Sequence, residues 1–421
     1  MRTNWAGNYT YQAPHLRQAT TIAEAQEIVA AARKVRVLGS RHSFNGIADS
    51  EETQLSLAAL NKVLAIDVAN MRVEVEGGIR YGDLAPVLEE HGLALANLAS
   101  LPHISVAGAV ATATHGSGSD TGNLATAVVA MDIITASGEI ARLSRDADGD
   151  TFAGAVVNLG ALGAVARMTL EVEPTYEVRQ DVYTGLSHDV LASDFDAIFG
   201  AAKSVSVFTD WRGATTQAVW LKQVVDAKSG QGAARAEFFG ARAATKNQHP
   251  LPGGDATVCT PQLGVPGAWH ERLPHFRMAF TPSNGAEIQA EYFLPRDTAA
   301  RTIAAMRQHG DRLAPILMIS ELRTIAADNL WLSPAHRGPC LAMHFTFKRD
   351  WEAIQTVLPA IEATLSPLGA VPHWGKVTTM PPAAVMRAYG RLGDFRDLAL
   401  AQDEPGKFRN SFVERFVFGE V

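Results

Sequence analysis

The stretch VRVLGSRHSFN, residues 35–45, is the part of the sequence around which the rest is organised. It opens with a short run of mostly apolar, β-branched residues, which is typical of a buried strand. Gly39 and Ser40 then predict a tight loop whose backbone N–H groups can bind an anion, and His42 lies in the same loop. On its own the stretch also fits a strand end with an idle surface histidine. A second stretch favours the binding interpretation.

Residues 98–118 (LASLPHISVAGAVATATHGSG) form that second stretch, and they are rich in Ala, Gly, Ser and Thr. Small side chains over so many positions let the backbone approach something large and flat. The alternative is tight packing of a helix on a sheet, which calls for small side chains but not for polar ones. The polar residues that favour binding are Ser100, Ser105, Thr112, Thr114, His115 and Ser117.

Composition limits the class of protein. The 421 residues predict two domains, and 47% hydrophobic with 19% charged residues is typical of a compact fold. The net charge of −7 argues against nucleic acid and anionic membranes as partners. Cys259 and Cys340 provide neither a disulfide framework nor a metal cluster. Since no apolar leader or long apolar run is present, we expect a cytoplasmic protein. We also expect a monomer.

Periodicity predicts a change of architecture near Pro174. Before it, Thr21 is expected to cap a helix over residues 21–34, with Glu24 three residues on. The other elements predicted there are strands at residues 64–67, 72–76, 128–135, 140–143 and 167–172 and a helix at residues 81–91. Those predicted after it are strands at residues 205–211, 218–223, 276–281, 288–294, 318–325 and 342–348, helices at residues 297–310 and 351–365, and a loop at residues 227–261. This second part reads as an antiparallel sheet with flanking helices.

Three segments look like familiar motifs, but their residues or spacings do not match them. The glycines of residues 116–122 do not have the Rossmann arrangement, and the histidines of residues 270–275 are too far apart for a zinc-binding H-E-x-x-H. Residues 401–407 lack the first glycine of a P-loop. We therefore predict no metal site.

Two predicted strands carry polar residues on one face. Glu321 and Arg323 alternate with apolar neighbours, as do His344 and Thr346. The two pairs could line one polar pocket, or they could belong to a solvated sheet face with a cross-strand ion pair. Lys376 follows in a short run, HWGK, which also fits a surface turn.

Taken together, these segments resemble the vanillyl-alcohol-oxidase family of flavoproteins, and within it the bacterial alditol (xylitol) oxidases. The match follows the order of the family along nearly the whole chain. The supporting segments are residues 4–8, 37–45, 100–108, 114–118, 208–212, 264–277, 321–324, 342–346, 373–376 and 406–410.

The resemblance implies an α+β fold: a two-part FAD-binding domain of the vanillyl-alcohol-oxidase (PCMH) type, plus an α+β cap domain with a large antiparallel sheet. The expected boundaries are residues 1–176 for the FAD-binding domain, 177–375 for the substrate or cap domain, and 376–421 for a C-terminal segment that returns to the first domain.

The resemblance also implies FAD as the cofactor, linked covalently through His42, because a neutral imidazole nitrogen can attack the flavin 8α-methyl group. Arg41 is a departure, since glycine is expected there in the family. The positions that match FAD-binding residues are Gly39, Ser40, Arg41, Ser43, Ser100, Ser105, Gly108, Thr112, Ala113, Thr114, His115, Gly163 and Val165.

The implied reaction is oxidation of the C1 hydroxyl of a polyol such as xylitol or sorbitol, with hydride transfer to flavin N5 and reduction of O2 to hydrogen peroxide. His344, Lys376, Arg323 and Glu321 match the catalytic residues. Ser100, Glu321, Arg323, Thr346 and Lys376 match the substrate pocket. The alternatives are an aldonolactone or 2-hydroxy-acid oxidase or dehydrogenase of the same family, and a flavin-binding protein without turnover.

Overall fold

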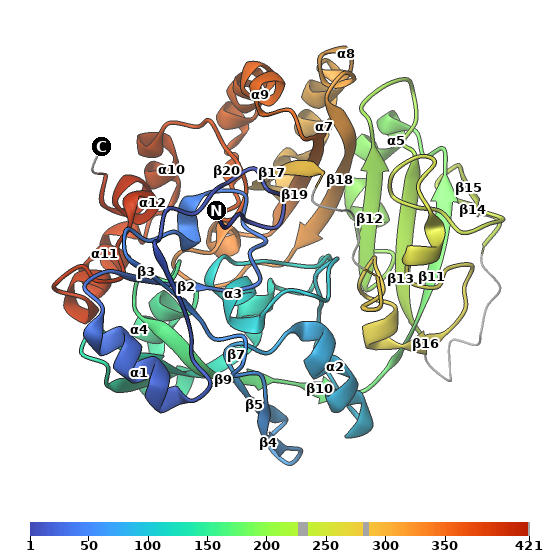
Figure 1. Ribbon diagram of the computed structural model, residues 1–421. Helices are drawn as coiled ribbons and strands as arrows, with labels where there is room; N and C mark the ends of the chain where they lie inside the picture. The colour runs from blue at the N-terminus through green and yellow to red at the C-terminus, as the bar shows by residue number, and fades with distance from the viewer. Residues whose placement is uncertain (226–234, 281–285, 420–421) are drawn as a thin grey trace.

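The computed structural model describes residues 1–225, 235–280 and 286–419. The N-terminal half of the chain and a large antiparallel sheet face each other, and the C-terminal helices return to the N-terminal half (Figure 1). No described helix is long and apolar enough to cross a membrane. The predicted α+β class, with a large antiparallel sheet, is confirmed.

A small parallel sheet begins the fold, with strand order β1-β3-β2. Helix α1 (Ile22–Ala31) starts after Thr21, whose hydroxyl accepts the N–H of Glu24 at 3.1 Å, so the predicted cap is confirmed. The loop of residues 39–45 follows β2, as the sequence indicated. The strands are β1 (His15–Gln18), β2 (Val35–Leu38) and β3 (Thr53–Ser56).

A five-stranded sheet of order β4-β5-β9-β7-β8 completes the N-terminal half. The predicted hairpin is confirmed, since β7 and β8 pair antiparallel across the turn at Gly138. Every residue of β7 is buried, so both faces of the sheet are covered at this strand, which lies between β9 and β8. The elements are β4 (Val63–Asp67), β5 (Arg72–Glu76), β7 (Val128–Ile134), β8 (Ile140–Ser144), β9 (Ala164–Glu171), α2 (Tyr81–Glu90), α3 (Val106–Ala111) and α4 (Arg145–Val156), with β6 (Leu93–Ala94) paired to β10 (Glu173–Pro174).

The large sheet has ten strands in the order β14-β15-β11-β13-β12-β18-β19-β17-β20, with β16 paired to β11, and all its pairings are antiparallel. The strands are β11 (Glu177–Thr184), β12 (Ser204–Thr209), β13 (Ala218–Val225), β14 (Glu237–Phe238), β15 (Ala241–Ala243), β16 (Gly267–Ala268), β17 (Glu287–Pro295), β18 (Leu317–Ile325), β19 (Cys340–Lys348) and β20 (Val371–Pro372).

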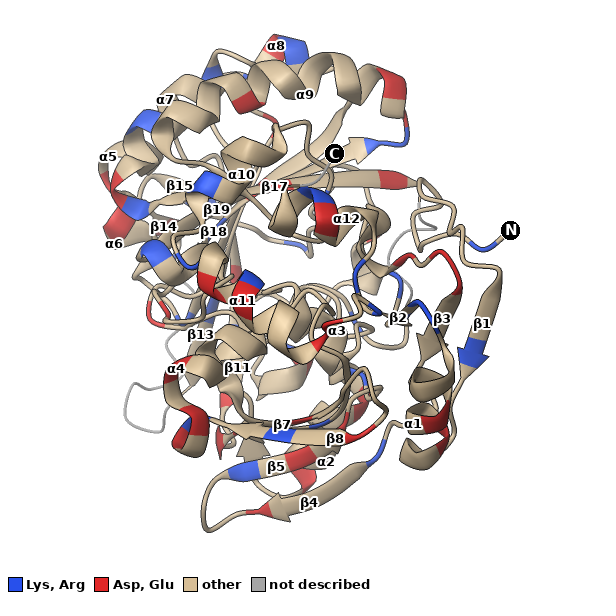
Figure 2. Ribbon diagram, turned by 90° about the vertical axis from the view of Figure 1, so that its left-hand side faces the viewer, with Lys and Arg blue, Asp and Glu red and all other residues tan. Residues whose placement is uncertain are grey.

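The two faces of this sheet have different neighbours. Tyr292 of β17 donates its hydroxyl to Glu362 of α9 (2.6 Å), so this face packs against the helices (Figure 2). The preceding residue, Glu291, points the other way and contacts His115 of the N-terminal half at 3.1 Å. The helices of this part of the chain are α5 (His188–Ser193), α6 (Phe195–Phe199), α7 (Ala299–Arg307), α8 (Gly310–Leu313) and α9 (Trp351–Leu365).

The C-terminal segment packs against the loop that follows β2. The buried guanidinium of Arg36 donates to the carbonyl oxygens of Phe408 (2.7 Å) and Gly160 (2.8 Å). Asn410 donates to the carbonyl oxygen of Asp49 at 2.8 Å. Residues near both ends of the chain therefore share buried hydrogen bonds. The helices of this segment are α10 (Pro382–Ala388), α11 (Leu392–Gln402) and α12 (Ser411–Val413).

Three features of the second half differ from the prediction. Residues 276–280 do not form a strand, and residue 281 lies outside the described residues: Phe276 makes a single bridge with Cys259, and its N–H is bound by the carbonyl oxygen of Ser100. Strand β11 was missed because Gln180 and Asp181, both buried, break its apolar pattern. The predicted loop at residues 227–261 contains the short strands β14 and β15, and its residues 227–234 lie outside the described residues.

Candidate active site

A cavity of about 610 Å³ lies between the N-terminal half and the open face of the large sheet. Its lining comes from the loop after β2, from the small-residue stretch around α3, and from β17, β18 and β19. The two stretches that the sequence singled out therefore meet the polar strand faces at one site. Of the predicted site residues, Ala113 alone does not line the cavity: it is buried, with φ of +53°.

The glycines of this cavity leave room that a side chain would fill. A Cβ atom on Gly39 would lie 2.9 Å from Ser105 Oγ, and one on Gly108 would lie 2.7 Å from the same atom. Ser105 Oγ is buried and has no hydrogen-bond partner among the described residues. An orphaned hydroxyl between two bare backbone segments is a site for a ligand that brings its own polar atoms. This arrangement fits a large, flat cofactor such as FAD.

Arg41 occupies a backbone conformation that favours glycine. Its φ of +65° lies in the left-handed region, where a Cβ atom is strained. This is the physical reason why glycine would suit the position. The chain holds Arg41 there through a hydrogen bond from the N–H of Trp5 to the Arg41 carbonyl oxygen (2.8 Å).

His42 points into the cavity with a free nitrogen. Its ring stacks on Trp5 with centroids 5.2 Å apart, and its Nδ1 is buried without a hydrogen-bond partner among the described residues. Burial, and then the nearby ammonium of Lys376, lower the pKa of His42 to about 4. The imidazole is therefore neutral at physiological pH, with a lone pair available.

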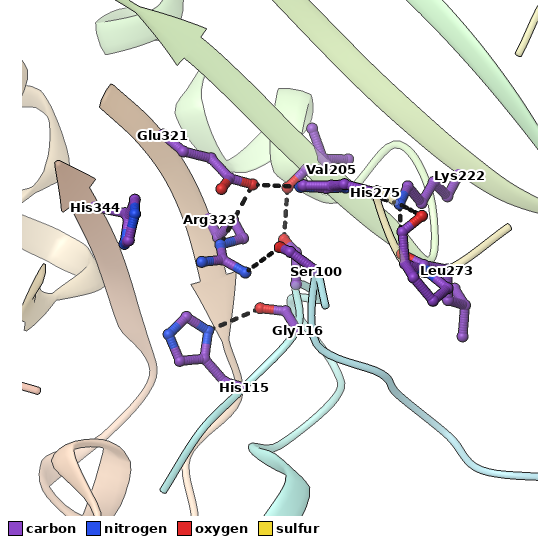
Figure 3. Close-up of polar contacts among 12 residues, drawn as sticks. Ser100, His115, Gly116, Val205, Lys222, Leu273, His275, Glu321, Arg323 and His344 are labelled. Atoms are coloured by element: carbon purple, nitrogen blue, oxygen red, sulfur yellow. Dashed lines mark hydrogen bonds and ion pairs between the residues drawn. The ribbon is translucent and has the colours of Figure 1, made fainter. Parts of the chain in front are cut away.

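The alternation predicted for β18 is confirmed, and it brings the charged pair Glu321 and Arg323 together with His275 and Ser100 (Figure 3). Glu321 Oε1 accepts from His275 Nε2 at 2.8 Å and lies 3.4 Å from Arg323 Nε. Arg323 Nη1 donates to Ser100 Oγ at 3.2 Å. Burial raises the pKa of Glu321, but Arg323 and His275 outweigh it and hold that pKa far below its usual range. Glu321 is therefore ionised.

The pair on β19 faces the same cavity. His344 Nε2 lies 3.2 Å from Thr346 Oγ1, and its Nδ1 lies 3.3 Å from Glu291 Oε2. Lys376 donates to Gln289 Oε1 and lies over the ring of Phe44. Burial lowers the pKa of Lys376 to about 8. Of the two interpretations of the strand faces, the structure thus supports the polar pocket over the solvated surface.

Sequence reasoning missed the polar residues that β17 contributes. Gln289 and Glu291 alternate with Ile288, Ala290 and Tyr292, which is the same pattern that drew attention to β18 and β19. Buried Glu291 contacts three charged or titratable side chains. Its partners are His115 (3.1 Å), Arg323 (3.3 Å) and His344 (3.3 Å). His275 and His373, also in the cavity lining, gave no periodic signal because they lie outside regular strands.

Comparison with known proteins identifies the family of the chain. A family model described as an FAD binding domain matches residues 13–144, and one described as D-arabinono-1,4-lactone oxidase matches residues 282–416. An alditol oxidase of Streptomyces sp. is 46% identical over 421 residues, covering 99% of both chains. An L-gulonolactone oxidase of Mus musculus is 25% identical and covers 99% of this chain and 98% of its own.

The fold has a more distant match among solved structures. Cholesterol oxidase from B. sterolicum superimposes with a TM-score of 0.77 at 14% identity, covering 99% of this chain and 96% of the other. These findings define an FAD-dependent flavoprotein oxidoreductase with the fold of the vanillyl-alcohol-oxidase family. Within that class, the chain belongs to the alditol oxidase family.

Proposed function

We propose that this protein oxidises the C1 hydroxyl of an alditol, such as xylitol or sorbitol, to the aldose, with O2 as the acceptor and hydrogen peroxide as the second product. The observation that carries the proposal is the convergence of Glu321, Arg323, His344, Thr346 and Lys376 in the cavity that Gly39, His42 and Gly108 also line. When bound, FAD takes the hydride of the alcohol carbon and passes two electrons to O2. In this proposal residues 1–176 form the FAD-binding domain and residues 177–375 form the cap domain over it. Residues 376–421 return to the FAD-binding domain.

His344 is the proton acceptor for the substrate hydroxyl. Its Nδ1 lies 3.3 Å from Oε2 of the Glu291 carboxylate, which only accepts, so Nε2, 3.2 Å from the Thr346 hydroxyl, is the nitrogen that serves as the acceptor in this proposal. Burial raises the pKa of Glu291, yet His115 and His344 outweigh it and hold the pKa well below its usual range. Glu291 therefore remains a carboxylate and keeps His344 in one orientation.

Arg323 and Lys376 lower the cost of negative charge on the substrate oxygen as its proton leaves. Glu321, Thr346 and Ser100 bind the remaining hydroxyl groups. A pocket built of hydrogen-bonding groups discriminates against deoxy analogues, because a missing hydroxyl leaves buried polar atoms unpaired. Glu321 and Glu291 would repel a substrate carboxylate, so the pocket favours a neutral polyol over a 2-hydroxy acid.

His42 is the site of covalent FAD attachment in this proposal. The free, neutral Nδ1 and the stacked Trp5 support it, since the ring is held and its lone pair is unused. If FAD is bound covalently here, the imidazole of His42 would hold it through the carbon of the 8α-methyl group. The residues positioned to hold the rest of the cofactor are Gly39, Ser40, Arg41, Ser43, Ser105, Gly108, Thr112, Thr114, His115, Gly163 and Val165.

Two measurements on the purified protein test the covalent FAD linkage and the oxidation of the polyol. The purified protein is precipitated with acid, and the visible absorbance of pellet and supernatant is compared for the wild type and His42→Ala. We expect yellow colour in the wild-type pellet and in the variant's supernatant. Anaerobic xylitol should bleach the native wild-type spectrum, with one peroxide formed per turnover once air is admitted. Bleaching by an aldonolactone but by no polyol would overturn the proposed substrate class.

A further inference from the structure

Behind the substrate pocket lies a buried lysine that the proposed reaction does not use. Lys222 of β13 is 1% exposed. Its ammonium donates to the carbonyl oxygens of Leu273 and Pro274 (3.1 Å) and lies 3.0 Å from Nδ1 of His275 (Figure 3). Among the described residues, no carboxylate lies within ion-pair distance of it. Burial lowers the pKa of Lys222 to about 7 and the charge of Glu321 raises it, so an ammonium at this position depends on the acceptors around it.

The three contacts of Lys222 determine where the protons lie. Carbonyl oxygens only accept, and the three N–H groups of an ammonium match two carbonyls and one imidazole nitrogen. His275 Nδ1 is therefore the acceptor, and its single proton lies on Nε2. That nitrogen is 2.8 Å from Oε1 of Glu321, to which it donates. Burial, and then Lys222, lower the pKa of His275 to about 4, which agrees with a neutral ring.

The ring of His275 is held in place from the sides. The ring of Trp220 packs against it with centroids 5.1 Å apart at an interplanar angle of 71°. The ring of Phe208 does so with centroids 5.6 Å apart at 64°. Its backbone N–H donates to the carbonyl oxygen of Ser100 at 3.1 Å. The segment that carries His275 is thus joined both to the sheet and to the residue whose hydroxyl accepts from Arg323.

Glu321 is left with one oxygen for a ligand. Oε1 is shared by His275 and Arg323, while Oε2 has no hydrogen-bond partner among the described residues. We propose that Lys222 and His275 form a positioning pair, which orders the protons from Lys222 through His275 to Glu321 and so aims Glu321 Oε2 at a substrate hydroxyl. This inference rests on the proposed function, because it assigns hydroxyl binding to Glu321.

The kinetic test compares three variants at this pair with a matched control. His275→Leu removes the donor to Glu321, whereas the side-chain amide of His275→Gln can still donate near the position of Nε2. Lys222→Met keeps the length and burial of the side chain but removes its N–H groups. Lys407→Met is the control, because Lys407 is also buried on two carbonyl oxygens, Val29 (2.7 Å) and Ala30 (3.1 Å), and does not line the cavity.

We expect His275→Leu and Lys222→Met each to raise KM for xylitol by about tenfold or more, with kcat within about threefold of the wild type. His275→Leu removes the charge-assisted hydrogen bond to the binding carboxylate, and Lys222→Met removes the donor that keeps the proton of His275 on Nε2. The double variant should raise KM by about the same factor as either single variant, since the two residues act through one another. His275→Gln should raise KM less than His275→Leu. Lys407→Met should lower thermal stability without this change in KM. Equal KM values for Lys222→Met and the wild type, or for the Gln and Leu variants, would refute the pair.

A second readout does not depend on turnover. In protein labelled with [15N]histidine, the signals of His275 are those missing from His275→Gln. We expect a neutral ring with the proton on Nε2 in the wild type, and a changed proton distribution in Lys222→Met. A wild-type proton on Nδ1 would overturn the inference even if alditol oxidation is confirmed. A correct tautomer in a protein that oxidises no polyol would instead contradict the proposed function, which keeps the two failures distinguishable.

Discussion

Glu291 Oε2 lies 3.3 Å from Nδ1 of His344, and the other oxygen of the same carboxylate lies 3.1 Å from Nε2 of His115. His115 Nδ1 is also bound, at 2.8 Å, to the carbonyl oxygen of Gly116. One buried carboxylate on β17 therefore contacts two histidines of the cavity and orients both rings.

We expect Glu291→Gln to lower kcat/KM for xylitol by about two orders of magnitude, because removal of one partner of a buried charged cluster leaves the others uncompensated. The change should appear mainly in kcat, since His344 loses the group that orients it. The measurement is steady-state kinetics per FAD-loaded molecule. Glu362→Gln is the control, as Glu362 is equally buried but accepts from Tyr292 on the opposite face of the sheet. Wild-type kinetics in Glu291→Gln would contradict this role.

The pH dependence of the reaction should follow Lys376. Burial lowers its pKa to about 8 from the ordinary value of 10.5, so the charged form is present below that pH and is lost above it. If the ammonium stabilises the substrate oxygen, kcat/KM falls as the pH rises through about 8. Lys376→Arg should remove this fall, because a guanidinium stays charged, while Lys376→Met should be slow at every pH. A profile that is flat across pH 8 in the wild type would refute the assignment.

Replacement of Arg41 by glycine should stabilise the protein. A residue other than glycine at φ of +65° is strained, while glycine gains more freedom in the unfolded chain, so the expected net gain is about 0.5–1 kcal/mol. Arg41→Ala keeps the Cβ atom and should show no such gain. Chemical denaturation measures both. A loss of stability in Arg41→Gly, with none in Arg41→Ala, would contradict the strain argument.

Replacement of Arg36 should be among the changes that lower the free energy of unfolding most. Its guanidinium binds the carbonyl oxygens of Leu159 (2.5 Å), Gly160 (2.8 Å) and Phe408 (2.7 Å), all in the interior. Arg36→Met leaves these carbonyl groups without a donor, and we expect the free energy of unfolding to fall by about 3 kcal/mol or more. Arg33→Met, at an exposed side chain, is the control and should change it by less than about 0.5 kcal/mol. Similar stabilities for the two variants would refute the interpretation.

Local patterns predicted the local structure well where one signal dominated. Thr21 with Glu24 predicted the start of α1, and alternation predicted β18 and β19 with the correct inner face. The same rule failed for β11, because Gln180 and Asp181 are buried polar residues that tertiary contacts satisfy. It also placed a false strand at residue 276, where the backbone of Phe276 is bound by Ser100 rather than by a neighbouring strand.

The sequence by itself determined the antiparallel sheet with flanking helices of the second half, the two stretches that meet at the cavity, and the strand faces that carry Glu321, Arg323, His344 and Thr346, since each depends on a short-range period or on small residues in a row. Only the tertiary structure decided the proton order from Lys222 through His275 to Glu321, and the contacts of Glu291 with His115 and His344. These residues are far apart in the chain, and hydrogen-bond direction depends on distances that no sequence spacing specifies.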